Sequence, residues 1–187
     1  MTVPDLQCFH IAFAVRDIDE TLKHWRALLG PNTWYVWEPR PNGTRPAYGR
    51  AAGQTWELWE AKGKGDSPFH EYIEKYGEGV QHIGFWVEDV RSAVETALED
   101  GAKLQTASVD ASGNLVAQLL PRASVGEEHL SKLGMTAFVE SGAFGNVRIE
   151  YCGRAADDFL HQWLGEKFGD IVNEPPWAKP RTSVPGA

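Results

Sequence analysis

The chain has 187 residues, a formal net charge of −8 and 42% hydrophobic residues, which suits one domain or two small modules that share a core. The negative charge argues against a nucleic-acid surface. No stretch approaches the roughly 18 apolar residues of a membrane helix. Two cysteines are too few for a disulfide framework. The first residues lack the order of a secretion signal, so we expect a cytoplasmic protein without a membrane partner.

The first unit, 9–60, has the pattern of a strand, a helix and three further strands. Asp17 is a candidate N-cap with Glu20 as its capping-box partner, and Gly30 is a candidate helix stop. A turn rich in Pro, Asn and Gly separates the second and third strands. The expected elements are a strand at 9–15, a helix ending at Gly30, and strands at about 33–38, 45–52 and 55–60.

A second unit, 82–152, repeats this order with one interruption. A strand at 82–88 leads into a helix that starts near Asp89 and stops at Gly101. Residues 109–134 look inserted, and we consider them as a candidate lid. The strands of this unit are expected at about 82–88, 103–108, 135–140 and 146–152. We therefore predict a single domain over 1–187, with a connecting segment at 61–81 and a tail at 153–187 that holds a helix and a Pro-rich end.

The two units share a short sequence at the start of their first strands. One copy reads HIAFAVRDI from His10 and the other reads HIGFWVEDV from His82, 72 positions later. A duplication of this size indicates two similar units packed about a pseudo-twofold axis. Such packing can bring the two histidines face to face.

The last strand of each unit carries a glutamate among apolar residues. Glu57 lies between Trp56 and Leu58, and Glu150 lies between Ile149 and Tyr151. A carboxylate buried without a partner costs several kcal/mol, so each needs one. Pseudo-twofold packing would gather His10, Glu57, His82 and Glu150 at one point.

Two imidazoles and two carboxylates suit a divalent cation such as Co²⁺, Ni²⁺, Zn²⁺, Mn²⁺ or Fe²⁺. If Glu57 is not a ligand, His10, His82 and Glu150 remain as a 2-His-1-carboxylate set, which non-haem Fe(II) oxygenases use. Alternate residues of a strand share a face, so Trp59 shares the face of Glu57 and Trp86 shares that of His82. These tryptophans either line a pocket for an apolar or aromatic substrate or simply fill the barrel.

These residues resemble the vicinal oxygen chelate superfamily, which includes glyoxalase I, methylmalonyl-CoA epimerase, extradiol dioxygenases and bleomycin-resistance proteins. The resemblance covers 9–152 without the insertion. The order of motifs is most similar to that of the epimerases: ELW from Glu57, GDSP from Gly65, GVQHI from Gly79 and VRIE from Val147.

The resemblance implies an α+β fold of two βαβββ modules that form an open pseudo-twofold barrel around a metal site. It carries His10, His82 and Glu150 over as ligands, and Glu57 occupies the position that glyoxalase I uses for its fourth ligand. Relatives often form dimers, so a homodimer is a further expectation.

Three functions follow as hypotheses. The first is a metal-dependent isomerase or lyase of the epimerase type, in which Glu150 or Glu57 moves a proton beside a metal-bound carbonyl of a small organic substrate. The second is a ring-cleaving Fe(II) dioxygenase, which also needs a nearby acid that the sequence does not clearly provide. The third is a small-molecule binding protein of the antibiotic-sequestering type. Those proteins lack the ligand set, so its presence here argues against the third hypothesis.

Overall fold

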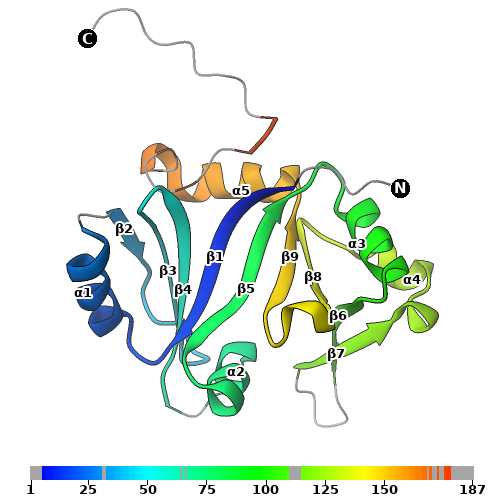
Figure 1. Ribbon diagram of the computed structural model, residues 1–187, viewed down its shortest axis with the longest axis horizontal. Coiled ribbons are helices and arrows are strands. Elements are labelled where there is room, and N and C mark those ends of the chain that lie inside the picture. The colour runs from blue at the N-terminus through cyan, green and yellow to red at the C-terminus, as the bar shows by residue number, and fades with distance from the viewer. Residues whose placement is uncertain are drawn as a thin grey trace, which may run out of the picture.

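The structure is a computed structural model of the chain (Figure 1). It describes residues 6–30, 33–63, 65, 67–109, 115–167, 169, 172 and 175–177. Within these residues, no helix is both long and apolar enough to cross a membrane. The fold is of the α+β class and is built on one curved sheet that does not close into a complete barrel (Figure 1).

The first module has the expected βαβββ order. Asp17 caps its helix, because its side-chain Oδ1 accepts a hydrogen bond from the backbone N–H of Glu20 at 3.0 Å. The helix ends before Gly30, whose φ of 79° is easily reached only by glycine. The elements are β1 Gln7–Val15, α1 Ile18–Leu29, β2 Thr33–Val36, β3 Thr44–Ala51 and β4 Gln54–Ala61, followed by the connecting helix α2 Pro68–Tyr76.

The second module repeats this order with one additional strand. Asp89 caps its helix as Asp17 does in the first module, by accepting from the N–H of Ser92. The elements are β5 Gly79–Trp86, α3 Val90–Glu99, β6 Lys103–Val109, β7 Leu115–Pro121, α4 Glu127–Leu130, β8 Thr136–Glu140, β9 Arg148–Cys152 and, after the repeat, α5 Arg154–Leu164. Short 3₁₀ turns lie at Arg122–Ser124, Gly142–Phe144 and Gly165–Lys167.

The pairing of the strands displays the duplication. The sheet order is β2-β3-β4-β1-β5-β9-β8-β6-β7. Each module places its last strand parallel to its first, β4 beside β1 and β9 beside β5. The two first strands, β1 and β5, pair antiparallel at the centre. The central pair therefore joins the two halves and brings the two histidine-bearing strands side by side.

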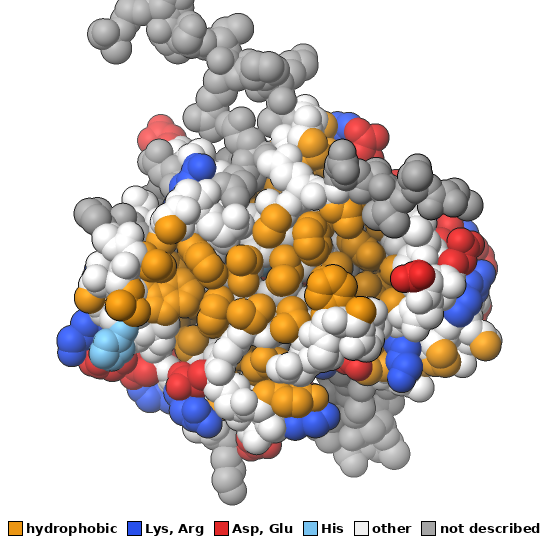
Figure 2. Space-filling model, viewed as in Figure 1, with side chains coloured by type: hydrophobic (Ala, Val, Ile, Leu, Met, Phe, Trp, Pro, Cys, Tyr) orange, Lys and Arg blue, Asp and Glu red, His pale blue; other side chains and the backbone are white. Residues whose placement is uncertain are grey.

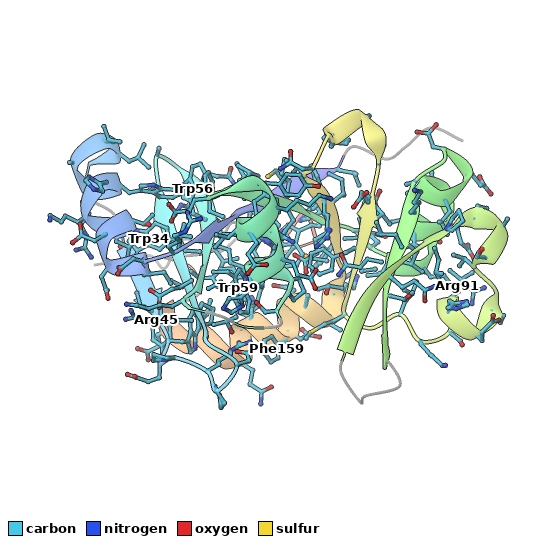
Figure 3. The ribbon with its side chains drawn as sticks, turned by 90° about the horizontal axis from the view of Figure 1, so that it is seen from below. Trp34, Arg45, Trp56, Trp59, Arg91 and Phe159 are labelled. Atoms are coloured by element: carbon cyan, nitrogen blue, oxygen red, sulfur yellow. The ribbon has the colours of Figure 1, made fainter. Side chains whose placement is uncertain are left out.

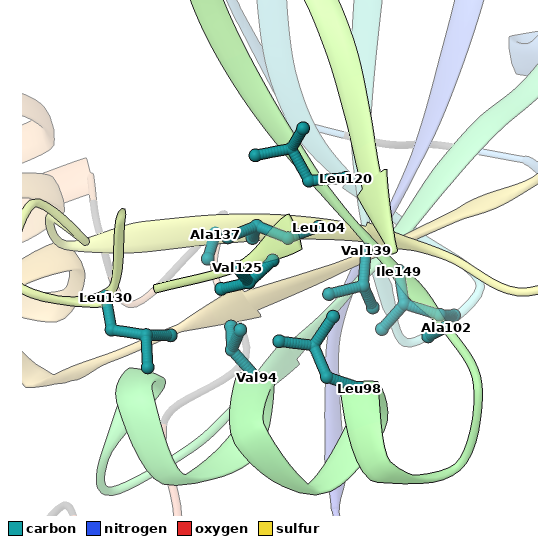
Figure 4. Packing of buried hydrophobic residues seen from close by; sticks show 10 residues of the cluster. All are labelled: Val94, Leu98, Ala102, Leu104, Leu120, Val125, Leu130, Ala137, Val139 and Ile149. Carbon is teal, nitrogen blue, oxygen red and sulfur yellow. The ribbon is translucent and has the colours of Figure 1, made fainter. Parts of the chain in front are cut away.

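The inserted segment lengthens the sheet at one edge. Strand β7 pairs with β6, and Val125 and Leu130 pack with Val94 and Leu98 of α3 (Figure 4). An ion pair from Arg91 to Glu127, at 2.7 Å, links α3 to α4. The described part of this segment thus lies beside α3 rather than over the centre of the sheet (Figure 1), and residues 110–114 lie outside the described residues.

The two faces of the sheet are covered differently. Helices α1 and α3 pack on one face, here called the outer face, and leave an apolar strip between them (Figure 2). The half-buried strand residues that alternate to this face include the apolar side chains of Ile11, Phe13, Trp56, Ile83, Phe85 and Tyr151. Arg45 also alternates to this face and forms an ion pair with Asp19 of α1. The other face, here called the site face, carries the two histidines. Helix α2 packs on it around Ala14 and Ala61, and α5 packs on it around Phe9 and Cys152.

Candidate metal centre

A β-bulge precedes each of the two histidines. Between β1 and β5 the register shifts so that Phe9 is an extra residue of β1, immediately before His10. A second shift makes Gln81 an extra residue of β5, immediately before His82. Bulges redirect side chains and are common beside functional sites. At each bulge, two consecutive residues contact each other through their side chains. Phe9 packs edge-on against the ring of His10, and Gln81 hydrogen-bonds to His82.

The four side chains expected from the sequence converge. The Nε2 atoms of His10 and His82 lie 3.0 Å apart. Oε2 of Glu57 lies 3.3 Å from Nε2 of His10 and 3.1 Å from that of His82. Oε2 of Glu150 lies 3.2 and 3.4 Å from the same two nitrogens. His10, His82 and Glu150 form a group that could hold a metal ion, with ligand atoms all within 4.8 Å of one another.

For the two imidazole nitrogens with either one of the carboxylate oxygens, these separations fit a single divalent ion. Ligand atoms about 2.1 Å from one ion lie about 3.0 Å apart at right angles and about 3.4 Å apart at tetrahedral angles. The four residues are also buried, with exposed fractions of 1% for His10, 4% for Glu57, 2% for His82 and 8% for Glu150. Ionisable groups gathered in so dry a place need a cation or shared protons to compensate them.

The surroundings of each histidine direct its Nε2 to the centre. Nδ1 of His82 pairs with Oε1 of Gln81 at 2.5 Å, so the amide oxygen accepts the ring proton and Nε2 is the nitrogen that could bind an ion. The ring of His10 lies directly over Gly84, the residue paired with it across the strands. A Cβ at Gly84 would stand 2.4 Å from Cε1 of His10, so only glycine leaves room for this ring. Nδ1 of His10 has no hydrogen-bond partner among the described residues.

Without a metal, hydrogen bonds from protonated imidazoles to ionised carboxylates stabilise the site. Burial alone would lower the pKa of His10, but hydrogen bonds to the carboxylates of Glu150 and Glu57 raise it to about 9. The pKa of His82 is raised for the same reasons. Burial would raise the pKa of Glu57, but hydrogen bonds from the two imidazoles lower it to about 2, and they lower that of Glu150 as well. A metal ion would replace those protons.

Each carboxylate has one further hydrogen-bond partner. Tyr48 lies opposite Glu57 in the β3–β4 pair, and its phenol donates to that carboxylate. The thiol of Cys152 donates to Glu150, two residues before it on β9. Burial, followed by the nearby carboxylate charges, raises the pKa of both Tyr48 and Cys152 well above ordinary values, so both remain protonated donors.

The two predicted pocket tryptophans lie on the site face, on either side of the four-residue cluster. Trp59 (labelled in Figure 3) stacks on Phe69 of α2 with ring centroids 4.5 Å apart, and the guanidinium of Arg40 lies over the Trp59 ring at 4.8 Å. Trp86 is 1% exposed and stacks on Phe9 at 4.1 Å. Helices therefore pack next to both tryptophan rings. The role of Trp59 and Trp86 in binding a substrate stays a prediction.

Sequence reasoning missed Gln81 and Tyr48. Strict alternation would turn Gln81 away from His82, and the bulge reverses this. Tyr48 is placed by the two-residue hairpin at Ala52 and Gly53, which have φ of 50° and 75° and so set the register of β3 against β4. That turn is the signal in the sequence that could have located the tyrosine.

Comparison with known proteins places this geometry in a family. Residues 9–117, more than half of the chain, match the model of the Glyoxalase/Bleomycin resistance protein/Dioxygenase superfamily. The chain belongs to this superfamily, the vicinal oxygen chelate family that the two histidine-bearing repeats resemble. No curated protein sequence matches it.

Solved structures share the fold at low identity. Methylmalonyl-CoA epimerase from Mycobacterium tuberculosis is 18% identical with a TM-score of 0.53, over 82% of this chain and 92% of that one. A variant of methylmalonyl-CoA epimerase from Streptomyces coelicolor, in complex with 2-nitronate-propionyl-CoA, is 20% identical with a TM-score of 0.51, over 79% of this chain and 93% of that one. A mutant of 4-hydroxymandelate synthase from Streptomyces coelicolor is 20% identical with a TM-score of 0.55, over 81% of this chain and 39% of that one.

Proposed function

We propose that this protein is a metal-dependent isomerase or lyase that moves a proton beside a carbonyl group of a small organic substrate. The observation that carries the proposal is the convergence of two imidazole nitrogens 3.0 Å apart with two carboxylate oxygens, each 3.1–3.4 Å from both nitrogens. Co²⁺, Ni²⁺, Zn²⁺, Mn²⁺ and Fe²⁺ all accept such a donor set.

In this proposal, the converging residues have separate roles as metal ligands and as the proton carrier. His10, His82 and Glu150 hold the ion. When bound, a divalent ion supplies Lewis acidity to a substrate carbonyl, which makes the adjacent C–H group more acidic. Glu57 removes that proton and returns it, while the phenol of Tyr48 orients its carboxylate by a hydrogen bond. Glu150 is the alternative proton carrier, with Glu57 then as the ligand, because the two occupy equivalent places in the repeats.

Substituting the two glutamates separates these roles. Glu150→Gln should bind Co²⁺ at least tenfold more weakly. Glu57→Gln should keep its Co²⁺ affinity and lose about 10²–10⁴-fold in the rate of proton exchange. Exchange of the C2 proton for deuterium in 2-methyl acyl thioesters, followed by NMR, is the assay, since a structurally similar methylmalonyl-CoA epimerase has been solved in complex with methylmalonyl-CoA. Glu99→Gln, on the exposed end of α3, is the control. Exchange that is equally fast with and without metal would contradict the proposal.

A ring-cleaving Fe(II) dioxygenase is the second candidate. The group formed by His10, His82 and Glu150 is a 2-His-1-carboxylate set, and the buried phenol of Tyr48 beside it is a candidate acid. Uptake of O₂ by the Fe(II)-loaded protein in the presence of catechols would favour this function. No uptake, together with proton exchange in the Co²⁺ form, would exclude it.

We also propose that the chain forms a homodimer through the apolar strip of the outer face (Figure 2). Ile11 and Ile83 are paired residues of β1 and β5, so they lie where the two repeats meet. The strip residues Ile11, Phe13, Trp56, Ile83, Phe85 and Tyr151 are apolar or aromatic, so a second copy of the chain can cover them in an isologous contact. Light scattering should give twice the chain mass for the wild type and the monomer mass for Ile83→Glu. A monomeric wild type would contradict this proposal.

A further inference from the structure

The C-terminal helix packs against the groups that hold the metal centre, although it lies outside the duplicated modules. Ala156, Leu160 and Leu164 of α5 are buried in one cluster. The same cluster contains four residues of the site face: Phe9, Tyr48, Trp86 and Cys152. Val172 is also part of it and is fully buried.

Three members of this cluster touch the candidate ligands directly. Phe9 packs edge-on against the His10 ring with centroids 4.3 Å apart. Tyr48 donates a hydrogen bond to Glu57, and Cys152 donates one to Glu150. A single intervening side chain therefore separates the packing surface of α5 from each of His10, Glu57 and Glu150.

Trp177 fastens this helix. Its indole Nε1–H donates to Oδ2 of Asp157 on α5 at 3.0 Å, and the guanidinium of Arg154 lies over its ring at 4.9 Å. Its ring also meets Trp86 edge-on, with centroids 5.6 Å apart. Trp86 stacks in turn on Phe9. The indole thus joins α5 to the row of rings that ends at His10.

We propose that α5 and Trp177 together form a positioning element of the metal centre, with Trp177 as the residue that fastens it. The element fixes the places of Phe9, Tyr48 and Cys152, and through them the orientation of His10, Glu57 and Glu150. The inference rests on the proposed metal site. It goes beyond it by assigning a role in that site to residues outside the two modules.

The test compares full-length variants by their binding of Co²⁺. Trp177→Ala removes the ring and the indole donor, whereas Trp177→Phe removes the indole donor to Asp157 and keeps a smaller aromatic ring. Removal of a group that supports metal ligands typically lowers affinity 10–100-fold. We expect a loss of at least about tenfold for Trp177→Ala, a smaller loss for Trp177→Phe and a changed visible absorption spectrum of the bound Co²⁺ in the alanine variant. Phe144→Ala, an aromatic residue 50% exposed outside this cluster, is the control.

The spectrum separates positioning from stability, because a merely structural role would lower the unfolding temperature and leave the Co²⁺ environment unchanged. Wild-type affinity and spectrum in Trp177→Ala would overturn the inference while leaving the metal site standing. A wild-type protein that binds no Co²⁺ would overturn the proposed function, and with it this role for the helix.

Discussion

Gly84 gives the strictest test of the local geometry. In Gly84→Ala, the new methyl carbon would stand 2.4, 2.6 and 2.9 Å from Cε1, Nδ1 and Nε2 of His10. An ordinary contact begins at 3.4 Å, so the imidazole must retreat by about 1.0 Å. Metal–ligand distances tolerate only about 0.2 Å. The displacement is several times this tolerance, and His10 should no longer reach a shared ion.

We therefore expect Gly84→Ala to weaken Co²⁺ binding by at least about 100-fold. Overpacking should also destabilise the metal-free protein by about 1–3 kcal/mol. Competition with a chromophoric chelator measures the affinity, and urea unfolding of the metal-free form measures the stability. Gly134→Ala is the matched control, because a Cβ there meets no atom within 4 Å. A folded Gly84→Ala variant with wild-type affinity would refute the placement of His10.

Three further predictions concern the support of the site, its protons and the core. Gln81→Ala removes the acceptor for Nδ1–H of His82 and should cost about 10–100-fold in Co²⁺ affinity; an unchanged dissociation constant in calorimetry would contradict this. Because the pKa of His10 is raised from 6.5 to about 9, the stability that its protonation gives the metal-free protein is present below pH 6.5 and lost as pH rises through about 9. Metal binding should therefore release protons and strengthen up to about pH 9, which calorimetry in buffers of different ionisation heat measures, and pH-independent affinity would be the contrary result. Leu98→Ala, at a residue 1% exposed in the core beneath α3 (Figure 4), should cost about 2–5 kcal/mol in urea unfolding without changing Co²⁺ affinity, whereas a loss of affinity would show that the core and the site are coupled.

Much of the fold could be predicted because the duplication is visible in two short segments of the sequence. The sequence repeat at His10 and His82 identified the first strands of both modules, and the caps at Asp17 and Asp89 located both helices. Glu57 and Glu150 could be named because a charged residue in an apolar strand demands a partner. All four side chains meet in the structure.

The rest depends on contacts that no local pattern encodes. The bulges at Phe9 and Gln81 break the alternation on which the assignment of faces depended. Cys8 illustrates the consequence: alternation predicts it on the face of His10, yet its sulfur accepts from Gln54 at 3.6 Å, whereas Cys152 does reach Glu150. The described part of the candidate lid forms an edge strand and a helix beside α3, and the tail helix packs on the site face. Both positions depend on long-range packing, which no local pattern predicts.

The central claim is that one cation binds where the two modules meet. Its most direct test is an anomalous difference map from crystals of the protein grown with Co²⁺, measured at the cobalt edge. We predict a single peak per chain, about 2.0–2.2 Å from Nε2 of His10, Nε2 of His82 and a carboxylate oxygen of Glu150. Ordered side chains without a peak between them, or a peak only at surface residues, would contradict it.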